Sequence, residues 1–94
     1  MPAKLPYHPR RTDGNQAEII GALELAGRRV QDLSRQGGGC PDLLVGTPSG
    51  RLVLLEVKMP GAVLNARELA WHLDWVGWPV FVVYDVAYAL EVTK

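Results

Sequence analysis

The chain has 94 residues, of which 48% are hydrophobic, so it can bury one modest core and is too apolar for a disordered protein. Its 10 basic and 10 acidic residues give a formal net charge of zero, which argues against tight nonspecific binding of nucleic acid by the monomer. No apolar run reaches the ~20 residues of a membrane span, and the single Cys40 excludes an internal disulfide. We expect a cytoplasmic protein with no signal peptide and no membrane partner.

Residues 1–12 are predicted to form an extended, basic, proline-rich arm ahead of a single domain over residues 13–94. Three prolines within the arm exclude a helix or a central strand. Lys4, Arg10 and Arg11 are candidate DNA-binding residues, because a basic arm can lie along a phosphate backbone. The arm could equally cross onto a second subunit or be a loose terminus.

A first helix is predicted from a cap at Asp13 or Asn15 to about Ala26, with Gly27 ending it. Its expected buried stripe, at helical spacing, consists of Ile19, Ile20, Leu23 and Ala26. Glu18 lies off this stripe, near the helix start, where the helix dipole favours an acidic side chain.

A first strand is expected over residues 29–34, followed by three glycines at 37–39. Successive glycines mark either a flexible connection or the close approach of another backbone. Beside the hairpin that follows they could admit a DNA strand, so Arg35, Gly38 and Gly39 are further candidate DNA-binding residues.

Two apolar strands, near residues 43–46 and 54–58, are joined by the loop Pro48-Ser49-Gly50. A three-residue hairpin loop usually needs a left-handed residue at its third place, and glycine adopts that conformation without steric cost. In such a loop Thr47 faces Arg51, which sets the register of the whole hairpin.

This register places Asp42 opposite Glu56. Because side chains alternate between the faces of a strand, Lys58 shares the face of Glu56. Two carboxylates in an apolar hairpin repel each other unless a cation lies between them, and oxygen ligands suit Mg²⁺. Lys58 would then orient or help deprotonate a bound water, or offset charge on a phosphate. A structural ion pair at the end of a sheet remains the simpler alternative.

A second helix is predicted from a cap at Asn65 to about Val76, ended by Gly77 and Pro79. Leu69, Leu73 and Val76 recur along it at helical spacing.

Two other pairs on this helix are one turn apart. Glu68 and His72 could bind a metal, although a pair on the helix surface is the simpler interpretation. Trp71 and Trp75 are more typical of core or interface anchors than of platforms for base stacking.

The apolar, β-branched run over residues 80–84 predicts a strand that is buried on both faces. A β-α-β connection should make this strand parallel to the second hairpin strand, with a right-handed crossover. Asp85 can cap a short final helix to Ala89 or Leu90. The element order α-β-β-β-α-β-(α) predicts an α/β fold in which helices flank a mixed central sheet.

Four segments together resemble the VRR-Nuc family (virus-type replication-repair nucleases) of the PD-(D/E)xK superfamily, especially its short stand-alone phage members. They are Asp13-Gly14-Asn15-Gln16-Ala17-Glu18-Ile19-Ile20, Gly39-Cys40-Pro41-Asp42-Leu43-Leu44-Val45-Gly46, Leu55-Glu56-Val57-Lys58, and Trp71-His72 with Trp75 and Gly77. The similarity runs from about Arg11 to Tyr84. It implies the restriction-endonuclease-like core, whose element order agrees with the one expected here.

The resemblance also implies an endodeoxyribonuclease that depends on Mg²⁺ or Mn²⁺ and acts in the host cytoplasm if the chain is phage-encoded. Asp42 and Glu56 would bind one or two ions, with the carbonyl of Val57 as a third ligand. Lys58 would position or activate the attacking water, and Glu18 would assist through water or metal.

Short stand-alone members of the family are associated with cutting branched DNA, four-way (Holliday) junctions in particular. That substrate has two-fold symmetry, which favours a C2 homodimer. Two alternatives stay open: a nicking or flap-type phage replication or packaging nuclease that works with a partner, and a non-catalytic DNA-binding domain of the same fold.

Overall fold

The computed structural model describes residues 14–94. The elements follow in the order α1 (Gln16–Leu25), β1 (Arg29–Asp32), β2 (Leu43–Gly46), β3 (Leu52–Val57), α2 (Ala66–Asp74), β4 (Val80–Val83) and α3 (Val86–Val92). This confirms the order expected from the sequence. The predicted arm over residues 1–12, with Lys4, Arg10 and Arg11, lies outside the described residues. Within the described part of the chain, no helix is long and apolar enough to cross a membrane.

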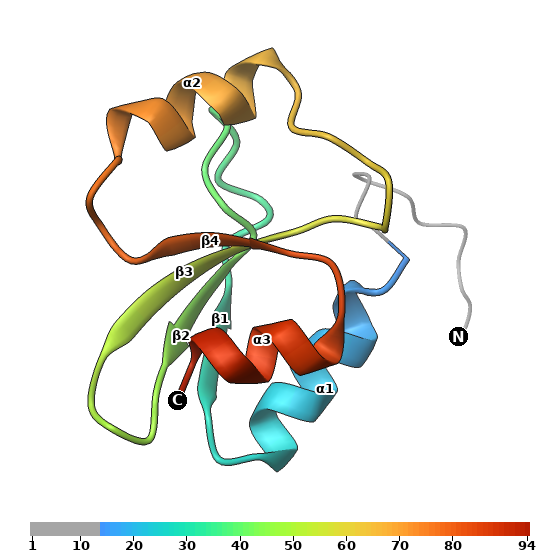
Figure 1. Cartoon of the computed structure of the whole chain (residues 1–94), viewed down its shortest axis with the longest axis vertical. Helices are drawn as coiled ribbons and strands as arrows, with labels where there is room; N and C mark the ends of the chain where they lie inside the picture. Colours follow the sequence, from blue (N-terminus) through green and yellow to red (C-terminus); the bar gives the residue numbers. More distant parts are fainter. Residues whose placement is uncertain (1–13) are drawn as a thin grey trace.

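The strands form one four-stranded sheet in the order β1-β2-β3-β4 (Figure 1). β1 and β2 are antiparallel, as are β2 and β3, whereas β3 and β4 are parallel. The sheet is therefore mixed, as predicted, and the parallel pair is the one that the β-α-β connection requires.

The β2–β3 hairpin has the predicted register. Gly46 pairs with Leu52, and the turn closes when the amide of Thr47 donates to the carbonyl of Arg51 at 2.9 Å. Gly50 has a φ of 87°, the left-handed conformation expected at the third place of the loop. Register in this hairpin thus follows from local turn chemistry.

One face of the sheet carries the core. α1 and α3 pack together on this face, whereas α2 lies on the opposite side of the sheet (Figure 1). The fully buried side chains come from α1, from β2, β3 and β4, and from α3, and they are Ile19, Leu23, Leu43, Val45, Val53, Leu55, Val57, Val83 and Ala89. Among residues 14–94, α2 is therefore the one helix that lies over the second face.

Several local expectations were wrong. Ala26 is exposed rather than part of the buried stripe, because α1 already ends at Leu25. β1 stops at Asp32, whose side chain accepts hydrogen bonds from the backbone and hydroxyl of Ser34 and so turns the chain away. β4 is an edge strand, and only its last residue, Val83, is fully buried.

Candidate active site

Asp42 and Glu56 face each other at the end of the β2–β3 hairpin. The ladder pairs Leu43 with Leu55, so the next residues outward along both strands are these two carboxylates. Asp42 is held by the backbone of β3, because the amide of Val57 donates to its Oδ2 at 2.8 Å. The side chain of Asp42 also hydrogen-bonds that of Glu56. The predicted convergence of the two acids is therefore present.

Glu56 is an almost fully buried carboxyl group, with 2% of its surface exposed. Burial raises its pKa to about 9, and the charge and hydrogen bond of Asp42 add to the effect, while Lys58 opposes it. Its Oε1 has no hydrogen-bond partner among the described residues. In the absence of a cation, the pair of acids thus keeps a proton at neutral pH.

This donor set fits a divalent cation. A cation between two carboxylates would take the place of the retained proton and would give the buried, unpartnered Oε1 of Glu56 a ligand to bind. Within residues 14–94, no three His, Cys, Asp or Glu side chains are placed to share an ion. A metal held here would therefore rely on Asp42 and Glu56 together with backbone oxygen and water, which is typical of Mg²⁺.

Lys58 is positioned by α2. Its Nζ lies 2.8 Å from Oε1 of Glu68, and both side chains are mostly buried. The same Glu68 forms a capping box with Asn65, in which each side chain binds the backbone amide of the other residue at 2.9 Å. The helix cap thus fixes the carboxylate that in turn holds the ammonium group of Lys58.

Burial acts to raise the pKa of Glu68, but hydrogen bonds from Lys58 and from the amide of Asn65 outweigh it and hold that pKa below its ordinary value. Glu68 is therefore an anion at neutral pH. Glu56 is protonated under the same conditions. The two neighbouring glutamates thus carry different charges, because Lys58 and the amide of Asn65 hydrogen-bond Glu68, whereas burial and Asp42 outweigh the effect of Lys58 on Glu56.

His72 also faces the site from α2. Its Nε2 lies 3.7 Å from Oε1 of Glu56, and neither atom has a hydrogen-bond partner among the described residues. Burial lowers the pKa of His72, Glu68 raises it and Lys58 lowers it, with a net decrease, so the imidazole is neutral at pH 7. The sequence favoured a surface pair for Glu68 and His72, whereas the structure brings both into the site.

The structure explains why glycines occupy residues 37–39. Gly37, Gly38 and Gly39 all have positive φ, and a Cβ on Gly39 would clash with the carbonyl group of Arg67 in α2. Close approach of another backbone, one of the two interpretations offered by the sequence, therefore accounts for Gly39. Beside it lies a hollow of about 240 Å³ that also touches Asp42 and Glu68.

Other predicted residues lie away from the carboxylates or make different contacts. Glu18 is exposed in the first turn of α1, and no hydrogen bond or ion pair joins it to the site within the described residues. Arg35 is exposed. Asn15 stands at the cap position of α1 but makes no capping bond; its Nδ2 instead donates to the carbonyls of Lys58 and Tyr84.

Gln16 lies in the first segment that resembles the VRR-Nuc family, but its burial was not predicted from the sequence. It is 5% exposed, it belongs to the buried side of α1, and its Oε1 has no hydrogen-bond partner among the described residues. Its burial could have been predicted from helical spacing, since Gln16 lies three residues before the buried Ile19.

Comparison with known proteins adds a structural relative. No protein-family model and no curated protein matches the sequence. A solved structure described as "VRR_NUC domain" superposes with a TM-score of 0.64 and 28% sequence identity, and the match covers 83% of this chain and 92% of the other. The two chains therefore share one domain almost from end to end.

Proposed function

Because this chain is a nuclease domain of the VRR-Nuc type, we propose that it is a structure-specific endonuclease that hydrolyses phosphodiester bonds in branched DNA, with Mg²⁺ or Mn²⁺ as its cofactor. Nucleases of the PD-(D/E)xK kind generally use divalent metals. The observation that carries the proposal is the facing pair of Asp42 and the buried Glu56, which keeps a proton where a cation fits, beside an ammonium group.

In this proposal the side chains have separate roles. Asp42 and Glu56 hold the ion together with the carbonyl of Val57, and Lys58, held by Glu68, orients the attacking water beside the phosphate. A metal bound there would stabilise negative charge on the phosphate and make its bound water more acidic. His72 stays neutral and limits the access of bulk water to Glu56.

Contacts with DNA are expected outside the carboxylates. Arg35, Gly38 and Gly39 border or lie next to the hollow beside Asp42, and Lys4, Arg10 and Arg11 would extend the contact along the backbone. Since the formal net charge is zero, binding should depend on this local basic surface and weaken strongly with salt. We expect the protein to act in the cytoplasm.

Four-way junctions are the proposed substrate because two paired cuts suit a two-fold symmetric enzyme. The described residues 14–94 form one sheet with its helices, so in this proposal a homodimer would recognise the junction through its geometry. Preference for a single-stranded flap would instead favour a monomer that works with a partner.

The test is the cleavage of labelled four-way junction, flap and linear duplex DNA in Mg²⁺ or Mn²⁺. We expect junction-selective cutting that Asp42→Ala and Lys58→Ala each reduce by at least about 10³-fold. Asp74→Ala and Lys94→Ala change exposed residues of the same types and should cut normally. Binding without any cutting by the folded parent would contradict the proposal and indicate a non-catalytic DNA-binding domain.

The role of Glu18 requires its own variant, since it is exposed on α1. Assistance through water or metal predicts a reduced cleavage rate for Glu18→Gln. Glu24→Gln, an equally exposed change on the same helix, is the matched control. Equal rates for the two variants would remove Glu18 from the proposed site.

A further inference from the structure

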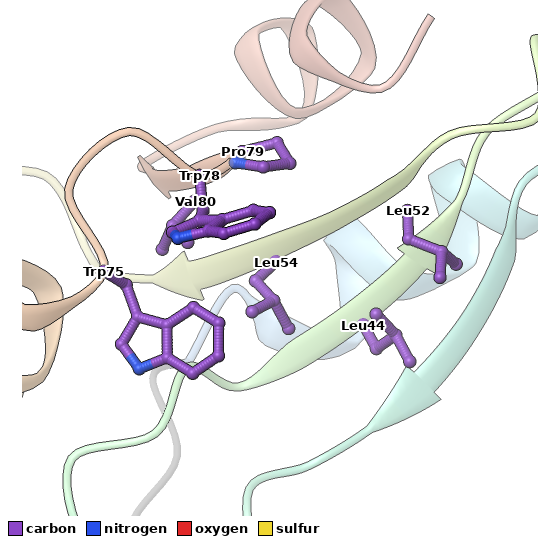
Figure 2. A pocket seen from close by; sticks show the side chains of 7 residues that line it. All are labelled: Leu44, Leu52, Leu54, Trp75, Trp78, Pro79 and Val80. Atoms are coloured by element: carbon purple, nitrogen blue, oxygen red, sulfur yellow. The ribbon is translucent and has the colours of Figure 1, made fainter.

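Two of the hollows in this structure differ sharply in character. One is an apolar groove of about 340 Å³, lined by leucines of β2 and β3 and by the segment that joins α2 to β4 (Figure 2). No charged side chain lines this groove within residues 14–94, so it offers nothing to a phosphate. The other is the hollow of about 240 Å³ beside Asp42, which we call the polar hollow.

The lining of the polar hollow indicates what kind of ligand fits there. Besides Asp42 and Glu68, it is lined by the three glycines at 37–39 and by Arg67 in the first turn of α2. No aromatic side chain among the described residues lines it, so a nucleobase finds no ring to stack on. Pockets that hold whole drug-sized molecules begin at about 300 Å³, so this smaller hollow suits one phosphate with its sugar.

Arg67 is fixed in place by its backbone. A Cβ on Gly39 would clash with the carbonyl group of Arg67, so the glycine loop and α2 meet there backbone to backbone. The side chain of Arg67 is exposed and has no hydrogen-bond or ion-pair partner among residues 14–94. The amides of Gly38 and Gly39 have no partner in that range either. One wall of the polar hollow thus combines a fixed backbone with unused hydrogen-bond donors.

The charges around the polar hollow leave one cation uncompensated. A divalent ion held by Asp42 and Glu56 would neutralise both carboxylates. Glu68 is paired with Lys58, whose Nζ lies 2.8 Å away. Arg67 is then the one charge lining the hollow that no other described residue balances, and a planar guanidinium matches the oxygens of a phosphate.

We infer that Arg67 binds a backbone phosphate of the DNA strand in the polar hollow, with the amides of Gly38 and Gly39 as further donors. This rests on the proposed function, which assigns DNA as the ligand. Because the hollow touches Asp42, the phosphate held there lies next to the site of cleavage. Arg67 is thus a substrate-binding residue that places the strand against the carboxylates.

The first test is the binding of a labelled four-way junction in EDTA, followed by fluorescence anisotropy over a range of salt concentrations. Arg67→Ala should weaken binding about tenfold and should reduce the slope of log affinity against log salt by about one, the value for one phosphate contact. Arg67→Lys should keep the slope, because it keeps the charge. Arg29→Ala, an exposed change on β1 opposite Gly46 near the hairpin turn, is the matched control and should change neither quantity.

The second test identifies the phosphate. Single phosphates near the branch of the junction are replaced by uncharged methylphosphonates, one in each DNA. At one position the replacement should weaken binding by the parent about tenfold and should have almost no effect on binding by Arg67→Ala, because the same contact is already lost. Circular dichroism confirms that the variants are folded. An Arg67→Ala protein with the affinity and salt slope of the parent, or equal losses for both proteins at every position, would overturn the inference.

Cleavage in Mg²⁺ separates this inference from the proposed function. A parent that cuts nothing, yet loses one unit of salt slope on the Arg67→Ala change, contradicts the nuclease and supports the phosphate contact. A parent that cuts junctions, and whose Arg67→Ala variant binds with unchanged slope, supports the nuclease and contradicts the contact. A folded parent that binds no DNA contradicts both.

Discussion

Replacing Glu56 by glutamine should stabilise the metal-free protein. The carboxyl group has an ordinary pKa of 4.5, and burial together with Asp42 raises it to about 9 in the folded chain. At pH 7 the folded protein must therefore bind a proton that the unfolded chain has lost. At 1.36 kcal/mol per pH unit, the interval from 4.5 to 7 destabilises the fold by about 3 kcal/mol.

The sign follows from linkage. A raised pKa in the folded state means that the stability contributed by Glu56 is fully present below pH 4.5 and is lost as the pH rises toward about 9. Glutamine keeps the shape of the protonated acid and does not titrate. The gain in the free energy of unfolding for Glu56→Gln should thus be under about 1 kcal/mol at pH 5 and about 2–3 kcal/mol at pH 7.

The assay is urea and thermal unfolding in EDTA at several pH values. For a domain of this size the gain at pH 7 corresponds to a rise in Tm of roughly 10 °C. Asp74→Asn, an exposed change of an acid to its amide, controls for the lost charge. A Glu56→Gln variant that is less stable than the parent at pH 7, or whose gain does not depend on pH, would refute the reasoning.

Substitutions at Gly39, Asn65 and Glu68 test the contacts that position α2 and Lys58. Gly39→Ala should lower the free energy of unfolding in urea by about 2–4 kcal/mol, because its Cβ meets the α2 backbone. Gly38→Ala, with open space around its Cβ, should lower it by about 1 kcal/mol. Equal losses for the two variants would contradict this. Asn65→Ala should lose about 1 kcal/mol and Asn65→Asp almost none, as a capping residue predicts. Glu68→Gln should lower kcat about tenfold with little change in KM, because Lys58 loses its anionic partner; an unchanged kcat would show that this ion pair does not serve the reaction.

The hairpin was predictable because its determinants are local. A glycine at the third place of the loop sets the pairing of Thr47 with Arg51, and the opposition of Asp42 and Glu56 follows by counting residues. The cap of α2 at Asn65 was predictable for the same reason. Local chemistry thus specified the two acids and the start of the helix that covers them.

The orientation of α2 was not predictable from spacing. Periodicity identified Leu69 and Leu73 as a stripe, but both are exposed, and the helix turns Glu68 and His72 toward the carboxylates instead. A pattern shows which residues share a side of a helix, whereas the packing of that side depends on elements distant in sequence. The backbone contact of Gly39 with α2 is another such long-range outcome.

The most direct test of the account is the binding of Mn²⁺, measured by calorimetry at pH 7 in buffers of different ionisation enthalpy. If Asp42 and Glu56 form the metal site, binding must displace the proton that the pair retains, so the parent should release about one proton per ion. Glu56→Gln should bind far more weakly and release none. Binding of equal strength by both proteins, or no binding by the folded parent, would contradict the claim that these carboxylates hold the catalytic metal.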